Sequence, residues 1–217
     1  TGEDGNATLE FGDGSRLLVQ ANSQLNLKSL NAYGRTNVMD TLLQLVRGRV
    51  DNQVVPRSVA AARYEVSTPG AASAVRGTRC RLGRDTGTAT ARTEVLEGSV
   101  SFRGGGKTQA VAKGLGSLAT ADKPLSLPVP LLVPPNAAAL PPVVTRVPIQ
   151  LALPAVKGAV AYRAQIAPDD RFETLLFDGV SPSPAVRGPD LPDGDYLLRV
   201  RGIDAKGLEG RDAHHRF

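Results

Sequence analysis

The residues of this chain best able to carry chemistry are one cysteine and two histidines: Cys80, His214 and His215. Adjacent residues of a strand point to opposite faces, so the two histidines are poorly placed to share a metal ion. Two arginines flank Cys80 and would lower its thiol pKa if it were exposed. A core position on a strand, on the same face as Thr78 and Leu82, explains this cysteine better. These residues indicate neither a nucleophile nor a metal site.

Two further patterns look like ligand sites but are explained better as turns. Gly106-Lys107-Thr108 looks like the end of a phosphate-binding loop, yet Ser101 stands where that motif needs a glycine, and strand-like residues flank it. Several aspartates could offer oxygen ligands to calcium, but Asp-Gly and Pro-Asp pairs are first of all turn formers. They are Asp169, Asp170, Asp190, Asp193 and Asp195. The sequence thus predicts no catalytic residue, metal or cofactor, and we expect a protein that is not an enzyme.

The composition predicts an all-β protein. Of 217 residues, 41% are hydrophobic and only 4% aromatic, so the cores must be built from Val, Leu and Ala. The 23 glycines and 16 prolines favour short strands and turns over long helices. The net charge is +5, but the arginines are scattered singly, which argues against nucleic-acid binding. A single cysteine excludes an internal disulfide, and no apolar stretch approaches the roughly 20 residues that cross a bilayer.

A Pro-rich stretch divides the chain. Half of the 16 prolines lie between Lys123 and Ile149, where they remove backbone donors and favour an extended, semi-rigid connector. We expect a first domain over residues 1–123, a linker over 124–148 and a second domain over 149–217. The chain begins at Thr1, and its second domain is short for a sandwich. We therefore expect a piece of a longer protein, with a last strand beyond Phe217.

Turn signals and alternating residues predict antiparallel strands in both domains. In the first domain, Gly12-Asp13-Gly14 and Gly48 each separate two expected strands. Val46-Arg47-Gly48-Arg49-Val50 is echoed by Leu96-Glu97-Gly98-Ser99-Val100, which favours a roll or sandwich of similar hairpins. In the second domain, the run that ends at Tyr196 resembles a tyrosine corner, whose hydroxyl bonds back to nearby backbone.

The most informative residues lie in three ordered segments: Tyr64–Pro69, Val75–Thr78 and Glu94–Val100. The residue before a proline is pushed to extended geometry, so we expect a strand to end at Thr68-Pro69. Arg76 is placed to pair with Glu65 or Glu97. Such a pair makes the segments determinants of the fold, and contact with a ligand is the alternative. The residues given this structural role are Thr68, Pro69, Val75, Arg76, Gly77, Thr78, Glu97, Gly98 and, in the second domain, Tyr196.

In this order and spacing, the three segments resemble the FecR domain, a family known from a periplasmic regulator of iron-citrate uptake. The resemblance covers roughly Thr1 to Lys123 and implies a β-sandwich or roll and an exported, periplasmic location. Cys80 stands where the family more commonly has a large apolar residue such as Phe, so we expect different packing there. That regulator also spans the membrane and has a cytoplasmic segment acting on a sigma factor. This chain contains neither part.

The second domain resembles a fibronectin type III-like module, which is an immunoglobulin-type β-sandwich, through Ala161–Ile166 and Leu198–Asp204. Proteins that pair these two modules often carry an upstream LysM domain that binds peptidoglycan. The resemblance therefore implies an association with peptidoglycan through a part of the protein that this chain lacks.

We expect a non-enzymatic, exported scaffold or interaction protein of the bacterial cell envelope, with an envelope protein or peptidoglycan as its partner. The alternative is a periplasmic sensor that relays an envelope or iron-uptake signal to a sigma factor. A third reading is an envelope enzyme or carbohydrate-binding protein with its site on the sandwich loops. The low aromatic content argues against sugar binding, which uses aromatic platforms.

Overall fold

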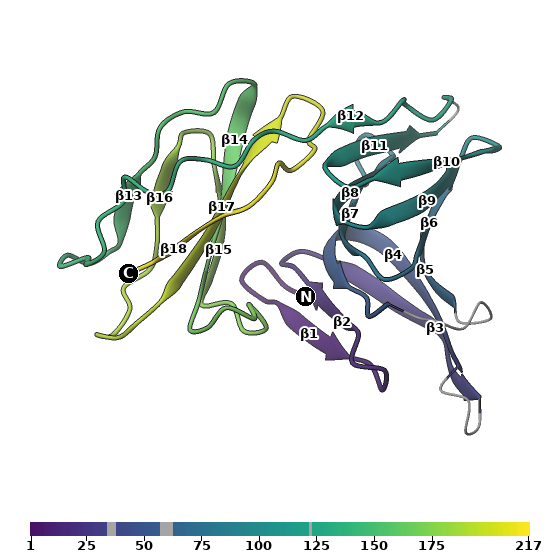
Figure 1. The fold of residues 1–217 in the computed structure, drawn as a ribbon, viewed down its shortest axis with the longest axis horizontal. Coiled ribbons are helices and arrows are strands. Elements are labelled where there is room, and N and C mark those ends of the chain that lie inside the picture. The colour runs from purple at the N-terminus through teal and green to yellow at the C-terminus, as the bar shows by residue number, and fades with distance from the viewer. Residues whose placement is uncertain (34–37, 57–62, 122) are drawn as a thin grey trace. The chain divides into compact units, whose positions relative to one another are not determined.

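The computed structural model describes residues 1–33, 38–56, 63–121 and 123–217, which form strands and loops without a helix (Figure 1). The predicted all-β fold is confirmed. The chain divides into two compact units, Thr1–Pro130 and Leu131–Phe217, and each has its own apolar core. A search of the described residues for a helix long and apolar enough to cross a membrane found none.

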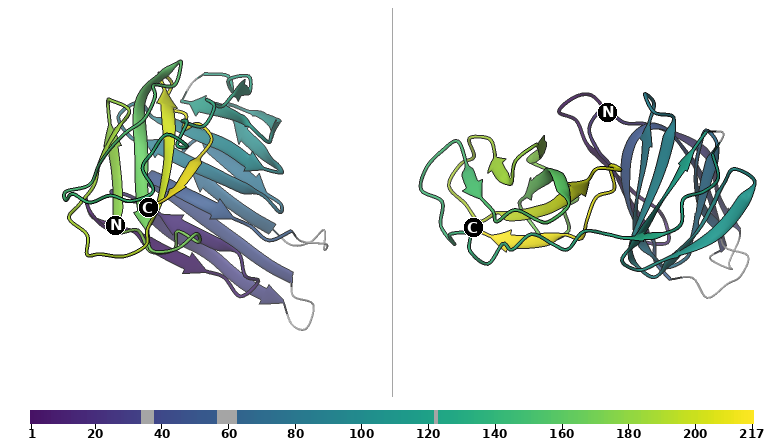
Figure 2. Two further views of the ribbon diagram at one scale, coloured as in Figure 1. Left: turned by 60° about the vertical axis from the view of Figure 1, so that its left-hand side comes forward. Right: turned by 90° about the horizontal axis from the view of Figure 1, so that it is seen from above.

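The strands of unit 1 lie side by side in one curled sheet (Figure 2). Their central order is β10-β9-β6-β5-β4-β7-β8-β11-β12; β2 and β3 pair with β4, and β1 pairs with β2. The pairing of β4 with β5 is parallel, and the other ladders are antiparallel. The strands are β1 (Ala7–Glu10), β2 (Arg16–Val19), β3 (Gln24–Tyr33), β4 (Val38–Gln53), β5 (Arg63–Thr68), β6 (Ala71–Val75), β7 (Arg79–Asp85), β8 (Thr90–Glu97), β9 (Ser99–Gly104), β10 (Lys107–Ala112), β11 (Leu115–Thr120) and β12 (Val129–Pro130).

Strand β4 is continuous where the sequence predicts two strands flanking Gly48. Its first half pairs with β3 and β5, and its second half pairs with β2 and β7. Gly48 has a φ of 89°, and a Cβ there would lie 2.5 Å from the Cα of Ser23. Glycine therefore lets β4 turn a corner between two sets of partners without interrupting the strand.

The core of unit 1 is built mainly from Val, Leu and Ala, as the composition predicts. Tyr64 on β5 packs edge-on against Phe11, with ring centroids 5.8 Å apart. Its hydroxyl donates to Oδ1 of buried Asn52 at 3.0 Å, and the Asn52 amide donates to the carbonyl oxygen of Cys80 at 3.4 Å. These bonds join β5, β4 and β7 inside the core. They also give the buried polar groups of Tyr64 and Asn52 the partners that such groups need.

Unit 2 contains two sheets around its own core (Figure 1). The larger sheet has the order β15-β14-β17-β18, and the smaller one pairs β13 with β16. Alternate residues of β14 and β17, including Ile166, Leu198 and Val200, face the core. The strands are β13 (Gln150–Ala152), β14 (Ala159–Ala167), β15 (Phe177–Ser181), β16 (Ala185–Arg187), β17 (Leu197–Asp204) and β18 (Ala213–Arg216).

Residues of the Pro-rich stretch take part in both units. Within it, β12 pairs with β11 of unit 1, whereas Ala137 and Leu140 are buried in the core of unit 2. The division into a domain over 1–123, a linker over 124–148 and a domain over 149–217 stays a prediction. The stretch packs against both units because burying its apolar Leu and Ala side chains is favourable.

Candidate functional site

Thr78 is the point at which three parts of unit 1 meet. Its side chain is 2% exposed, and its hydroxyl lies 2.9 Å from the carbonyl oxygen of Ser99 and 3.1 Å from that of Arg76. Its own carbonyl oxygen accepts a hydrogen bond from the backbone N–H of Val54 at 3.0 Å. Thr78 therefore ties the end of β4 to the β6–β7 connection and to the start of β9.

Two glycines beside Thr78 leave no room for a side chain. Gly77 has a φ of 59°, and a Cβ on it would lie 2.8 Å from the Cα of Pro56. Gly98 has a φ of 71°, and its Cβ would lie 2.9 Å from the Thr78 hydroxyl. Both positions combine left-handed backbone with close backbone approach, which glycine alone accepts without strain.

Thr68 and Pro69 form the turn between β5 and β6. Thr68 pairs with Ala71, and the two residues between them are Pro69 and Gly70. Gly70 has a φ of 87°, the sign that a type II turn requires at its third position, and proline is favoured at the second. The strand therefore ends where the sequence predicts.

The expected pairing of Arg76 with Glu65 or Glu97 is absent among the residues that the structure describes. Arg76 is exposed, while Glu65 pairs with Arg63 at 3.0 Å and with Arg103 at 3.8 Å. The hydrogen bond from Arg63 to Glu65 raises the pKa of Arg63. Arg76 lies beside the Thr78 junction, and its backbone carbonyl rather than its guanidinium contributes to it.

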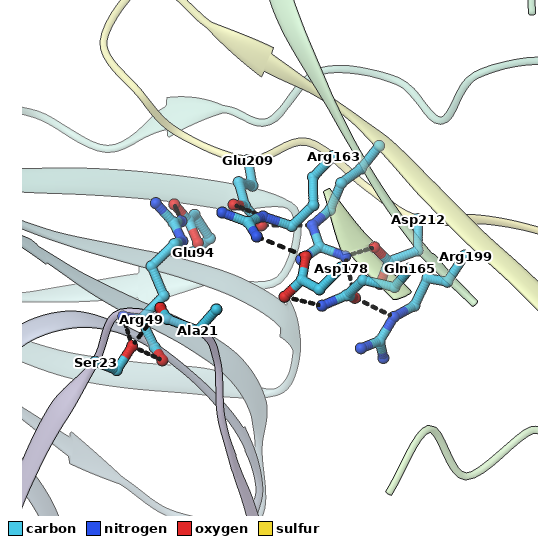
Figure 3. Close-up of polar contacts among 11 residues, drawn as sticks. Ala21, Ser23, Arg49, Glu94, Arg163, Gln165, Asp178, Arg199, Glu209 and Asp212 are labelled. Atoms are coloured by element: carbon cyan, nitrogen blue, oxygen red, sulfur yellow. Dashed lines mark hydrogen bonds and ion pairs between the residues drawn. The ribbon is translucent and has the colours of Figure 1, made fainter. Parts of the chain in front are cut away.

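The sequence echo around Gly48 and Gly98 has a counterpart in hydrogen bonding. At Gly48, the backbone N–H of the following residue, Arg49, donates to the hydroxyl of Ser23 at 2.9 Å (Figure 3). At Gly98, the carbonyl oxygen of the following residue accepts from the hydroxyl of Thr78. Each hydroxyl occupies the space that a glycine leaves open. The hydroxyl partners lie more than 20 residues away in the chain, so the local pattern does not identify them.

Cys80 in unit 1 and the two histidines of unit 2 are the residues whose types could do chemistry. Cys80 is fully buried, as expected, and its burial raises the pKa of its thiol, with the charges of Asp51 and Glu94 acting in the same direction. His215 lies 2.9 Å from the carbonyl oxygen of Pro141, and the ring of His214 packs against Phe172. No group of three or more His, Cys, Asp or Glu side chains able to hold a metal occurs in the described part of the chain.

Gly106-Lys107-Thr108 belongs to the hairpin between β9 and β10, which agrees with the reading as a turn. Gly105 and Gly106 have φ values of 54° and 72°, the signs that a two-residue type I′ turn requires.

Tyr196 makes the backbone contact expected from the sequence. Its hydroxyl donates to the carbonyl oxygen of Pro192 at 2.9 Å, four residues earlier in the chain. Its backbone N–H and C=O both pair with Phe217, which joins the start of β17 to the end of the described chain. That this contact and those around Thr78 serve the fold rather than a ligand stays a prediction.

A polar network lies on the face of β14 and β17 opposite their core residues, where most of its side chains are buried, and sequence reasoning missed its partners (Figure 3). Arg163 contacts Asp178 at 2.6 Å and Glu209 at 2.8 Å, and Arg201 also pairs with Glu209. Gln165 Oε1 accepts from both Arg199 and Arg201 at 3.0 Å. Alternation along these strands predicts which residues share this face. It does not predict their partner Glu209, which lies in the loop after β17. Asp212 also pairs with Arg201 at 3.3 Å, so three arginines face three carboxylates, and the network indicates a structural role.

Residues 1–101 match the family model described as FecR protein. The predicted FecR resemblance is therefore confirmed for this segment, which contains the Thr78 junction and its two glycines. A search of curated proteins found no match.

Solved structures show the same fold for part of the chain. One is a crystal structure, at 2.50 Å, of a protein from Parabacteroides distasonis described as an anti-sigma factor. It is 12% identical, with a TM-score of 0.50 over 60% of this chain and 57% of that one. At this identity the likeness shows the fold alone, and the chain spans little more than half of that structure's length.

Two other structures are less similar. A second crystal structure with the same description, at 1.65 Å, is 11% identical over 60% of this chain and 57% of that one, with a TM-score of 0.49. The extracellular domain of a Bacteroides protein (B. thetaiotaomicron) described as a one-component system is 10% identical, with a TM-score of 0.23. The match covers 96% of this chain and 36% of that one.

Proposed function

We propose that this chain is a non-enzymatic, extracytoplasmic part of a regulatory protein that receives an envelope signal and relays it through protein contacts to a sigma factor. The FecR match over residues 1–101 carries this proposal, and the fold shared with a protein described as an anti-sigma factor supports it. Both findings fit the regulatory alternative better than the scaffold that we expected first.

The contacts of the motif residues support a role without catalysis. The Thr78 hydroxyl is engaged with backbone carbonyls, and Gly77 and Gly98 lie against neighbouring backbone or side chains. Residues committed in this way build a rigid frame, on which function resides in the exposed surfaces of loops and strands.

Unit 2 fits the fibronectin type III-like module that the sequence resembles. The order β15-β14-β17-β18 facing a second, smaller sheet supports this assignment, and so does the hydroxyl contact of Tyr196. We include this module in the proposal as a partner-binding or spacing element. Association with peptidoglycan through another part of the protein rests on the resemblance alone and stays a prediction.

The proposal is tested in the native host by removing the codons for residues 1–130 from the chromosomal gene while keeping the reading frame. We expect a small set of transcripts under one alternative sigma factor to change when the envelope is stressed. Unchanged transcripts together with a weakened envelope, measured by detergent sensitivity, would support the scaffold instead.

Export is tested separately with alkaline phosphatase fused after Phe217 of the full-length gene. This reporter folds only outside the cytoplasm, because its disulfides need an oxidising compartment. We expect an active fusion, and an inactive one that accumulates at normal levels would contradict the periplasmic location.

A further inference from the structure

A groove of about 680 Å³ lies in unit 2 between the segments 142–149 and 190–196. One wall exposes two aliphatic side chains, Val143 at 67% and Val147 at 57%. Its volume is in the range of ligand-binding clefts, and the two valines give it apolar surface that the aliphatic side chains of a partner can cover.

The opposite wall is acidic. Asp190, Asp193 and Asp195 line it, and all three are exposed. The groove is lined by described residues only, and none of them is Lys, Arg or His. The chain as a whole has a net charge of +5, and Arg146 is exposed between two lining residues, but the lining itself carries only the three negative charges. A bound partner must therefore be cationic to gain from electrostatic complementarity.

These carboxylates differ from the aspartates that shape turns elsewhere in unit 2. Asp169 accepts a hydrogen bond from the backbone N–H of Arg171, and Asp204 accepts from Lys206 and Leu208. Within the described residues, the side chains of Asp190, Asp193 and Asp195 make no such bond. Their oxygens remain available to a ligand, which the reading of these residues as turn formers does not explain.

An aromatic ring adds a second contact suited to a cation. Tyr196 lines the groove, and its hydroxyl is held by the carbonyl oxygen of Pro192. The Tyr196 ring lies against Phe217, with centroids 6.0 Å apart, so its orientation is supported from within the core. Aromatic faces beside carboxylates favour Lys and Arg side chains, whose aliphatic stems also need apolar surface.

We propose that this groove binds an extended basic peptide segment of a partner protein. A Lys or Arg of the segment lies against Tyr196 and the carboxylates of Asp190, Asp193 and Asp195, while its aliphatic neighbours cover Val143 and Val147. A small cation would leave the two valines exposed, and nucleic acid or an anionic lipid surface would be repelled by the three carboxylates. The proposal rests on unit 2 alone and does not depend on signalling to a sigma factor.

The test uses the whole chain and the peptide Val-Lys-Val-Lys-Val-amide, labelled with fluorescein at its N-terminal amine so that both lysines stay charged, followed by fluorescence anisotropy at low salt. We expect binding that weakens about tenfold in the triple variant Asp190→Asn, Asp193→Asn, Asp195→Asn, since three exposed ion pairs are lost. The matched control, Asp169→Asn with Asp170→Asn, alters two aspartates outside the groove and should bind like the wild type. A second variant, Val143→Ser with Val147→Ser, should weaken binding severalfold without changing the charge.

Two altered peptides and one measurement of size decide the outcome. A peptide with Glu in place of Lys should not bind, and a peptide with Ser in place of Val should bind severalfold more weakly. Equal binding of all three peptides, or equal binding by the triple variant, would overturn the proposal. So would self-association of the chain, seen by analytical ultracentrifugation, that the triple variant abolishes, because the occupant would then be a second copy. Circular dichroism of each variant checks that it is folded.

Discussion

At the scale of single residues, Gly77 and Gly70 together distinguish the cost of left-handed backbone from the cost of steric overlap when a glycine is replaced by alanine. Alanine at Gly70, where φ is 87° and no atom lies within 4 Å of the added Cβ, carries only the cost of left-handed backbone, about 1–2 kcal/mol. Alanine at Gly77 adds an overlap with the Cα of Pro56, which we expect to cost a further ~1–3 kcal/mol. Urea unfolding followed by circular dichroism measures both. Equal losses for Gly77→Ala and Gly70→Ala would show that the segment around Pro56 moves aside.

Asp85 makes the stability of unit 1 depend on pH. Burial alone would raise the pKa of Asp85, but hydrogen bonds from Thr88 and Gly87, together with the charge of Arg92, outweigh it and lower the pKa. The ionised carboxylate therefore stabilises the fold above its unfolded pKa of about 3.9, and this contribution is lost as the pH falls through the lower folded value. We expect the wild type to exceed Asp85→Asn in Tm at pH 7, and the difference to shrink as the pH falls below the unfolded pKa.

The substitution Asp85→Asn removes the charge but keeps the turn, because asparagine can still accept the backbone hydrogen bonds from Gly87 and Thr88. A difference in Tm that stays constant from pH 7 to pH 2 would mean that the substitution disturbs the turn rather than the charge.

At the scale of elements, a buried hydrogen bond from Tyr64 to Asn52 joins β5 to β4 in unit 1. Tyr64→Phe removes the donor to Asn52 and leaves a buried amide oxygen without it, so we expect a loss of about 1–2 kcal/mol in the free energy of unfolding. Tyr64→Phe combined with Asn52→Leu should cost less than the sum of the single variants, because no unpaired amide remains. Strict additivity in urea unfolding would show that the bond contributes little.

The sequence predicts those elements whose cause is local. The hairpins at Gly12–Gly14 and at Gly105–Gly106, and the turn at Pro69–Gly70, follow from turn chemistry within a few residues. The continuity of β4 was not predicted, because the hydroxyl that fits against Gly48 belongs to Ser23 on another segment. The expected pairing of Arg76 is missing for a related reason. Glu65 faces Arg63 and Arg103, whose nearness follows from the sheet order.

The same limit holds for the candidate sites. The types of Asp190, Asp193 and Asp195 are visible in the sequence, and so is the alternation that places polar residues of β14 and β17 on the face opposite the apolar core. The valines opposite the aspartates and the Glu209 partner of Arg163 are brought in by loops far along the chain. Long-range loop placement is not encoded in periodicity or turn signals, so these contacts needed the structure.

At the scale of the whole molecule, two separate cores predict two unfolding events. Each unit buries its own apolar cluster, and a domain with its own core can unfold as one cooperative step. We expect two transitions in differential scanning calorimetry, and Gly77→Ala should lower the Tm of only one of them. A single transition that shifts as a whole in this variant would show that the units unfold together.

The buried position of Cys80 makes its thiol a natural probe of how often unit 1 opens. The chain has no second cysteine and no tryptophan, and the thiol lies fully inside the core. A thiol reagent added to the native protein can react only in the moments when unit 1 opens, so the labelling rate reports the frequency of those openings. The rate can be followed by mass spectrometry in any variant, with or without a bound partner, and no engineered probe is needed.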